Sequence, residues 1–342
     1  MIVVMHKDAT REQIARVMDQ IAAAGLRPVD MPGGERTAVG VASAIPPELR
    51  GPLTSQLESL PGVQHVTQVS RPYKLASREF HPADTVVQVG EVAIGGSKVV
   101  LIAGPCAVEN REQMRAAARA VKEAGGSLLR GGAYKPRTSP YSFQGLEEEG
   151  LRLLQAVGEE MGLPTVSEVL DPHDVELVAS YVDLLQIGAR NMQNYPLLVA
   201  AGKSGRPVLL KRGMSASLDE WLLAAEYVMS AGESRVILCE RGVHPLDRTY
   251  TRYTLDLSCL PVLKELTHLP VVVDPSHATG NARLVPAMCK AAVAAGADGL
   301  MVEVHPRPEQ ALCDGPQSLA SDTLAQLMAE LGKVAAAVGR QL

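Results

Sequence analysis

The pattern of hydrophobic positions divides the chain into two parts near residue 70. In the first part, short β-branched runs at residues 2–5, 28–31, 37–44 and 63–69 alternate with two amphipathic segments. The first amphipathic segment follows a capping box of Thr10 and Gln13, and the second follows Pro46 and Pro47. The resulting order of strand, helix, strand, strand, helix and strand predicts a small α+β ferredoxin-like domain over residues 1–70, which is either a packing or dimerisation module or a regulatory ligand-binding module.

From residue 99 onward, continuous apolar runs alternate with segments of helical spacing. Eight runs begin near residues 99, 127, 164, 184, 207, 235, 270 and 299, and a helix rich in Ala and Leu follows from Ser321. Strands that are apolar on both faces are typical of a buried parallel sheet, and eight strand–helix units in series favour an α/β fold, a closed (β/α)8 TIM barrel over residues 99–342. Residues 71–98 are expected to hold a linker and a hairpin that turns at Gly90. An open doubly wound sheet is the alternative, but no dinucleotide-binding fingerprint accompanies the strands.

Composition narrows the class of protein further. With 342 residues, 46% of them apolar and 21% charged, the chain can bury a large core, which excludes a disordered protein. A net charge of −5 and only one Trp, eight Tyr and two Phe argue against a binder of nucleic acid or of anionic membranes. The five cysteines form no C-x-x-C pair, and neither a signal peptide nor an apolar span of membrane length is expected. We therefore expect a cytoplasmic protein that binds neither nucleic acid nor membranes.

The active site of a TIM barrel lies at the carboxyl ends of the strands, and closure makes the seventh, eighth and first strands neighbours. Cys106 follows the first strand, His277 follows the seventh, Glu303 ends the eighth, and Asp314 lies in the loop beyond. Each residue alone is more often a packing residue than a ligand, but four such donors on neighbouring loops favour a site for a divalent metal ion. Their mixture of soft and hard donors leaves manganese, iron, zinc and cobalt open. His305, two residues after Glu303, is an alternative ligand or a partner of one.

The other strand ends carry mainly basic residues, although the net charge of the chain is negative. The basic residues that follow the second, fourth, fifth and sixth strands are Arg130, Lys135, Arg137, Arg190, Lys211 and Arg241. Converging guanidinium and ammonium groups suit phosphate and carboxylate oxygens. Six cations exceed the needs of one monophosphate, so the pattern indicates one polyanion or two small anionic substrates next to a metal. Glu168 adds a carboxylate at the third strand.

Seven motifs lie at or near these strand ends: GPCAVE at 104–109, LRGGAYKPRTSPYSFQG at 129–145, QIGARNMQN at 186–194, LLKRGM at 209–214, VDPSHATG at 273–280, MVEVHP at 301–306 and CDGPQSL at 313–319. Together they resemble one enzyme family, the type I 3-deoxy-D-arabino-heptulosonate 7-phosphate (DAHP) synthases that carry an amino-terminal ferredoxin-like domain. The resemblance covers essentially the whole barrel and, more loosely, the first seventy residues. KPRTS discriminates most, because the related 3-deoxy-D-manno-octulosonate 8-phosphate synthases typically insert an asparagine before the arginine.

The resemblance implies an aldol-type condensation of phosphoenolpyruvate with erythrose 4-phosphate and water. This reaction gives DAHP and phosphate, and it is the first step of the shikimate pathway to chorismate and the aromatic amino acids. The family implies a divalent metal ion, manganese ahead of iron, cobalt or zinc, held by Cys106, His277, Glu303 and Asp314. The phosphoenolpyruvate site would comprise Arg130, Lys135, Glu168, Arg190, Lys211 and Arg241 with the backbone of Gly188 and Ala189. Arg137, Thr138 and Ser139 would hold the erythrose phosphate.

Proton transfer, assembly and regulation follow from the same resemblance. Lys135 is the expected general acid for the new hydroxyl, and Glu168 or a metal-bound water is expected to help deliver water to the adjacent cationic carbon. The family also implies a homotetramer and, for residues 1–70, feedback inhibition by an aromatic amino acid. The chain departs from the family pattern at Cys313, where serine is more usual, and in the loop 244–254.

Two other functions are compatible with these residues. One is an octulosonate phosphate synthase, which would use arabinose 5-phosphate in place of erythrose 4-phosphate. The other is a non-catalytic sensor that binds a phosphorylated metabolite and passes the signal through the amino-terminal domain.

Overall fold

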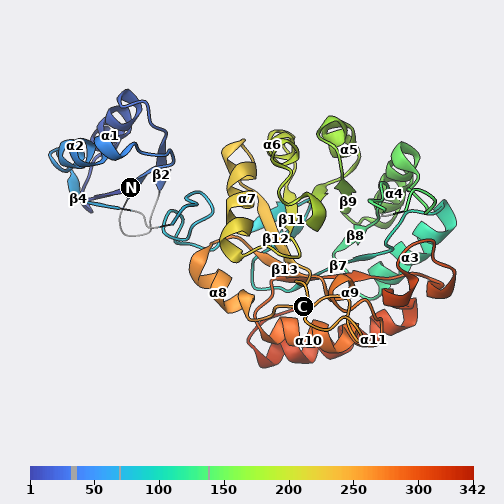
Figure 1. Cartoon of the computed structure of the whole chain (residues 1–342). Coiled ribbons are helices and arrows are strands. Elements are labelled where there is room, and N and C mark those ends of the chain that lie inside the picture. Colours follow the sequence, from blue (N-terminus) through green and yellow to red (C-terminus); the bar gives the residue numbers. More distant parts are fainter. Residues whose placement is uncertain (32–36, 69–70, 138) are drawn as a thin grey trace. The chain divides into compact units, whose positions relative to one another are not determined.

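The chain folds into two compact units in the computed structural model (Figure 1). The structure describes residues 1–31, 37–68, 71–137 and 139–342. One unit comprises Met1–Ala83 together with Leu266–His268, and the other comprises Asp84–Glu265 with Leu269–Leu342. The predicted fold class, a TIM barrel preceded by a ferredoxin-like domain, is confirmed.

The first unit is a four-stranded antiparallel sheet with two helices. Its elements are β1 (Ile2–Met5), α1 (Arg11–Ala23), β2 (Pro28–Met31), β3 (Ala38–Val41), α2 (Pro47–Glu58) and β4 (Val63–Thr67). The strand order β2-β3-β1-β4 is that of the split βαβ arrangement. Thr10 and Gln13 form the predicted capping box of α1. β3 is shorter than the expected run 37–44, while residue 69 of the fourth expected strand lies outside the described residues.

The second unit is a closed barrel of eight parallel strands. These strands are β7 (Val100–Gly104), β8 (Leu128–Arg130), β9 (Thr165–Val169), β10 (Leu184–Ile187), β11 (Val208–Lys211), β12 (Val236–Glu240), β13 (Val271–Val273) and β14 (Gly299–Glu303). Pairing of β14 with β7 closes the barrel, with Glu303 opposite Gly104. Nearly every strand residue is buried, which explains the continuous apolar runs in the sequence.

Helices follow the strands and surround them (Figure 1). They are α3 (Arg111–Glu123), α4 (Glu147–Met161), α5 (Val175–Tyr181), α6 (Tyr195–Lys203), α7 (Leu218–Ser230), α8 (Cys259–Leu266), α9 (Pro275–Thr279), α10 (Val285–Ala294) and α11 (Ser321–Ala337). Among the residues that the structure describes, no helix has the length and apolar character needed to cross a membrane.

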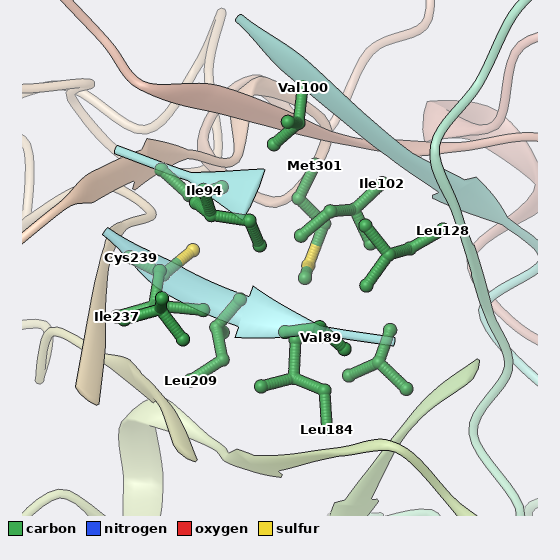
Figure 2. Packing of buried hydrophobic residues seen from close by; sticks show 13 residues of the cluster. Val89, Ile94, Val100, Ile102, Leu128, Leu184, Leu209, Ile237, Cys239 and Met301 are labelled. Carbon is green, nitrogen blue, oxygen red and sulfur yellow. The ribbon is translucent and has the colours of Figure 1, made fainter. Parts of the chain in front are cut away.

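A β-hairpin seals the amino-terminal end of the barrel. Its strands β5 (Val87–Val89) and β6 (Val92–Ile94) place Val87, Val89 and Ile94 in one buried cluster with side chains from the barrel strands. Figure 2 shows Val89 and Ile94 among Leu209, Ile237 and other side chains of this cluster. Because this end is packed with apolar side chains, polar chemistry is confined to the carboxyl ends of the strands.

Candidate active site

Four potential metal donors converge at the carboxyl ends of neighbouring strands. Cys106 lies in the loop after β7, His277 in α9, Glu303 at the end of β14, and Asp314 just before a 3₁₀ turn at Gly315–Gln317. One ligand atom of each residue lies within 4.8 Å of the corresponding atom of every other. The structure thus brings together the four donors predicted from the sequence. It does not place His305 in this group.

Glu303 is the most deeply enclosed of the four donors. Its side chain is fully buried, and its two oxygens accept hydrogen bonds from Arg130 Nη1 at 2.6 Å and from Gln317 Nε2 at 2.6 Å. Burial by itself raises the pKa of Glu303, but the positive charges of His277 and Arg130 bring this pKa down to about 2. The carboxylate is therefore charged at neutral pH and available as a donor.

His277 is oriented by a carboxylate that the sequence analysis did not single out. Its Nδ1 lies 2.8 Å from Asp274 Oδ2, and its backbone N–H donates to Asp274 Oδ1 at 3.0 Å. The opposite nitrogen, Nε2, lies 3.4 Å from Glu303 Oε1 and 3.9 Å from Asp314 Oδ2. A carboxylate on one ring nitrogen that leaves the other facing the donors is typical of a ligating histidine.

Asp274 also joins this group to the basic side of the barrel mouth. Its Oδ2 lies 2.5 Å from Lys211 Nζ, and both side chains are buried. Burial by itself raises the pKa of Asp274, but His277 and Lys211 hold it well below its ordinary value. Asp274 therefore provides a fixed negative charge between an imidazole and an ammonium group.

The thiol of Cys106 and a second thiol, that of Cys313, contact each other, and each accepts a hydrogen bond from a cation. Cys106 Sγ donates to Cys313 Sγ at 3.2 Å and lies 3.3 Å from Asp314 Oδ2. Lys135 Nζ donates to Cys106 Sγ at 2.9 Å, while Arg137 Nη1 donates to Cys313 Sγ at 2.6 Å. The hydrogen bond between the thiols lowers the pKa of Cys313 and raises that of Cys106, because the Cys106 proton is shared with the Cys313 sulfur.

A cavity of about 280 Å³ lies over these residues. The predicted site residues that line it are Lys135, Arg137, Ser139, Glu168, Gly188, Ala189, Arg190, Lys211, Arg241, His277 and Asp314. Thr138 lies outside the described residues. Arg130 does not line the cavity, because its guanidinium is buried against Glu303. Two of the six predicted cations, Arg130 and Lys211, therefore have carboxylate partners within the protein.

Arg241 has a hydrogen-bond donor that is available to a ligand in this cavity. Its side chain is buried, and among the described residues its Nη1 has no hydrogen-bond partner. The guanidinium carbon lies 4.3 Å from the ring centre of Tyr253, which supports one face of the group. A buried donor without a partner is costly, and an anion bound in the cavity would remove that cost.

Glu168 and Gly188 fit together closely on the opposite wall. Gln186 Nε2 donates to Glu168 Oε2 at 3.1 Å. A Cβ atom at position 188 would lie only 1.9 Å from Glu168 Oε1, so a side chain there would displace the carboxylate. Gly188 therefore allows the backbone that begins the 3₁₀ turn Ala189–Asn191 to approach Glu168.

The cavity also contains residues that the sequence analysis missed. Arg252 and Tyr253 line it, and Arg252 Nη1 lies 3.7 Å from Asp314 Oδ1 and donates to Gln317 Oε1 at 3.2 Å. Both residues belong to the loop 244–254, whose departure from the family pattern was the only signal in the sequence. Asp274 directly follows an apolar strand, but an acid in this position is equally typical of a helix N-cap, so the sequence does not single it out.

Both parts of the chain match models of known protein families. Residues 77–338 match the model of the DAHP synthetase I family, and residues 1–71 match that of the DAHP synthase ferredoxin-like domain. The chain is 46% identical over 339 residues to phospho-2-dehydro-3-deoxyheptonate aldolase of Thermotoga maritima, with 99% of each chain covered. A crystal structure of that DAHP synthase superposes with a TM-score of 0.78 at 45% identity, covering 99% of this chain and 98% of the other.

A second group of relatives matches only the barrel. The 2-dehydro-3-deoxyphosphooctonate aldolase of Syntrophotalea carbinolica is 38% identical over 271 residues, which cover 74% of this chain and 96% of the relative. A truncated form of the Thermotoga maritima DAHP synthase likewise covers 78% of this chain, with a TM-score of 0.73 and 46% identity.

The spacing of the two thiols predicts a specific response to oxidation. Hydrogen peroxide should take two electrons and two protons from Cys106 and Cys313, giving one disulfide and two water molecules, because their sulfurs lie 3.2 Å apart. In metal-free protein, peptide mapping by mass spectrometry should show these two residues linked and the other three of the five cysteines reduced.

Cys313→Ser is the matched control for this experiment. It should abolish the crosslink while leaving Cys106 in place. Loss of thiols in the unaltered chain without a Cys106–Cys313 link would contradict the geometry.

Proposed function

The chain belongs to the DAHP synthetase I family, and we propose that its barrel mouth carries out the reaction of that family with the residues described above. The protein is an enzyme, a 3-deoxy-7-phosphoheptulonate synthase, which condenses phosphoenolpyruvate with erythrose 4-phosphate and water to give DAHP and phosphate. The observation that carries the assignment of residues is the convergence of four donors within 4.8 Å beside a cationic cavity.

Of the two possible enzyme activities, that of an octulosonate phosphate synthase has the weaker support from related proteins. The octulosonate aldolases of Syntrophotalea carbinolica and Desulfotalea psychrophila cover 74% and 72% of this chain, whereas the Thermotoga maritima DAHP synthase covers 99%. The family model and the ferredoxin-like domain agree with the longer match.

Cys106, His277, Glu303 and Asp314 would hold one divalent metal ion. The donor set fits such an ion, because three of the four groups can carry negative charge and lie within 4.8 Å of one another in a largely buried site. When bound, the ion supplies a Lewis acid that polarises the aldehyde of the acceptor. Manganese is the first expectation, with iron, cobalt and zinc as alternatives for this mixture of soft and hard donors.

The cations that line the cavity would bind the two anionic substrates next to each other. We assign phosphoenolpyruvate to Arg190, Lys211 and Arg241 with the backbone of Gly188 and Ala189, supported by the unpartnered Nη1 of Arg241. Arg137 and Ser139, with Thr138 of the same loop, are assigned to erythrose 4-phosphate. Arg130 would act from beneath, by fixing Glu303. Positioning replaces the encounter of two like-charged molecules by an oriented contact.

Lys135 and Glu168 are the proposed proton-transfer residues. Lys135 Nζ lies between the donor group and the cavity, 2.9 Å from Cys106 Sγ, so its ammonium can donate a proton to the oxygen of the new hydroxyl. Glu168 faces the same cavity and is the proposed acceptor of a proton from the water that attacks the cationic carbon.

Regulation and assembly complete the proposal. We propose that residues 1–70 bind an aromatic amino acid that inhibits the enzyme, that the chain forms a homotetramer, and that it acts in the cytoplasm. The match of residues 1–71 to a domain found in DAHP synthases supports a role tied to this enzyme rather than an unrelated module.

Product analysis with two aldoses tests the reaction itself. With manganese present, the chain should consume phosphoenolpyruvate with erythrose 4-phosphate and release phosphate and DAHP, whereas arabinose 5-phosphate should support little turnover. Chromatography with mass detection identifies the product. Turnover with the pentose alone would overturn the choice, and no turnover with either would favour the non-catalytic sensor.

Removal of metal tests the proposed centre. Exhaustive chelation should abolish turnover, and addition of Mn²⁺ should restore it, because the ion held by the four donors would supply the Lewis acid that polarises the aldehyde. A coupled phosphate assay measures both steps. Activity that survives complete removal of metal, as verified by elemental analysis, would refute metal dependence.

Deletion of residues 1–70 tests the regulatory proposal. The shortened chain should keep its turnover and lose inhibition by phenylalanine, tyrosine or tryptophan, because a relative's truncated form retains a barrel that superposes on this one. Rate measurements over a concentration series of each amino acid check this. Loss of turnover together with inhibition would indicate a structural role instead.

A further inference from the structure

A buried acid–histidine pair lies next to the donor group, and the chemistry described above makes no use of it. The side chains of His305 and Glu109 are 5% and 9% exposed. His305 Nδ1 accepts the backbone N–H of Arg307 at 3.0 Å, so the neutral ring carries its proton on Nε2. This Nε2 lies 3.4 Å from Glu109 Oε1 and has no other partner among the described residues. The histidine therefore faces the carboxylate.

The same carboxylate oxygen holds a second loop. Glu109 Oε1 accepts the backbone N–H of Leu312 at 2.8 Å, although 203 positions separate the two residues. Glu109 belongs to the loop after β7, and Leu312 belongs to the loop after β14. One carboxylate thus ties together the two loops that meet where the barrel closes.

Each member of this arrangement lies next to a different metal donor in the sequence. Glu109 follows Cys106 by three residues, His305 follows Glu303 by two, and Leu312 precedes Asp314 by two. A shift of the carboxylate would therefore change the position of Cys106 relative to Asp314. It would do so without removing any donor atom.

Two features show that these donor loops need to be held. Asp314 has a φ of +55°, and among the described residues only one other non-glycine residue, Glu147, has a positive φ. Such a conformation persists only where the surroundings enforce it. In addition, the negative groups of the donor set lie within 4.8 Å of one another, so they repel each other whenever no cation lies between them.

We propose that Glu109 and His305 form a brace that positions Cys106 and Asp314 for metal binding, and that neither residue is itself a ligand. The proposal rests on the metal-binding role assigned above to the four donors. Its physical basis is preorganisation. The brace holds the mutually repelling donors and the strained backbone of Asp314 in place before the metal binds, which raises metal affinity. Both residues are thus positioning residues.

Direct measurement of metal binding tests the brace without relying on catalysis. Titration of the full metal-free chain with Mn²⁺, followed by the electron paramagnetic resonance signal of free Mn²⁺, gives the dissociation constant. Glu109→Ala should raise this constant roughly ten- to a hundredfold, as is typical when a residue that orients ligands is removed. Glu109→Gln keeps an oxygen that can accept from Leu312, so it should restore most of the affinity.

Two control variants separate the brace from general loss of stability and from direct ligation. Glu233→Ala removes another buried glutamate, which contacts Arg235 and none of the donors, so it should lower the melting temperature without changing the Mn²⁺ dissociation constant. His305→Gln should weaken Mn²⁺ binding to about the extent of Glu109→Ala. His277→Ala, which removes a donor, should abolish measurable binding.

The absorption spectrum of bound Co²⁺ supplies an independent readout. The d–d bands of Glu109→Ala should shift relative to those of the unaltered chain, whereas those of Glu233→Ala should not. Wild-type affinity and spectrum in Glu109→Ala would overturn the brace. Loss of binding in His305→Gln as complete as in His277→Ala would also overturn it, because His305 would then be a ligand.

The outcome for the unaltered chain distinguishes the brace from the metal site on which it depends. Failure of the unaltered chain to bind Mn²⁺ would refute the metal site, and the brace with it. Normal binding in the unaltered chain together with normal binding in Glu109→Ala would refute the brace alone.

Discussion

Pairing of β14 with β7 is the constraint on which the site depends. The first and last strands of the barrel meet along a register that sets Glu303 opposite Gly104. Cys106 and Asp314 follow these strands. Although 208 positions separate them in the sequence, the sulfur of Cys106 lies 3.3 Å from a carboxylate oxygen of Asp314. An open sheet with the same strands would leave these two residues at opposite edges. The donor group is therefore a property of closure rather than of any local motif.

Closure also concentrates charge, and the protein balances it with buried ion pairs. Glu303 has Arg130, and Asp274 has Lys211, with all four side chains almost entirely removed from water. Removing one partner from such a pair leaves an unpaired buried charge, which costs about 3–5 kcal/mol. The remaining cations, Lys135, Arg137, Arg190 and Arg241, lack a carboxylate partner at hydrogen-bond distance among the described residues and line the cavity. Arg130 is therefore committed to Glu303 beneath the cavity, whereas Lys211 both holds Asp274 and lines the cavity with the cations that have no carboxylate partner.

The sequence sufficed for the barrel because each strand is a short apolar run followed by a helix. The expected runs near residues 164 and 184 begin within one residue of β9 and β10. The four donors could be named because Cys106, His277 and Glu303 lie at or shortly after a strand end, while Asp314 lies in the loop after β14. Asp274 could not, since an acid before a short helix is equally typical of a helix cap, and it does cap α9. Arg252 could not either, because its place depends on how its loop returns to Thr279, through a backbone hydrogen bond of 3.1 Å.

Asp274 lies between the two halves of the barrel mouth, in contact with Lys211 on one side and with His277 on the other. An anion that attracts Lys211 would weaken its hold on the shared carboxylate and strengthen the attraction between that carboxylate and the imidazole. A more strongly polarised imidazole is a better electron-pair donor. With the proposed occupants, binding of an anion at Lys211 and of a cation at His277 would be linked, and each would change the affinity for the other by the same factor.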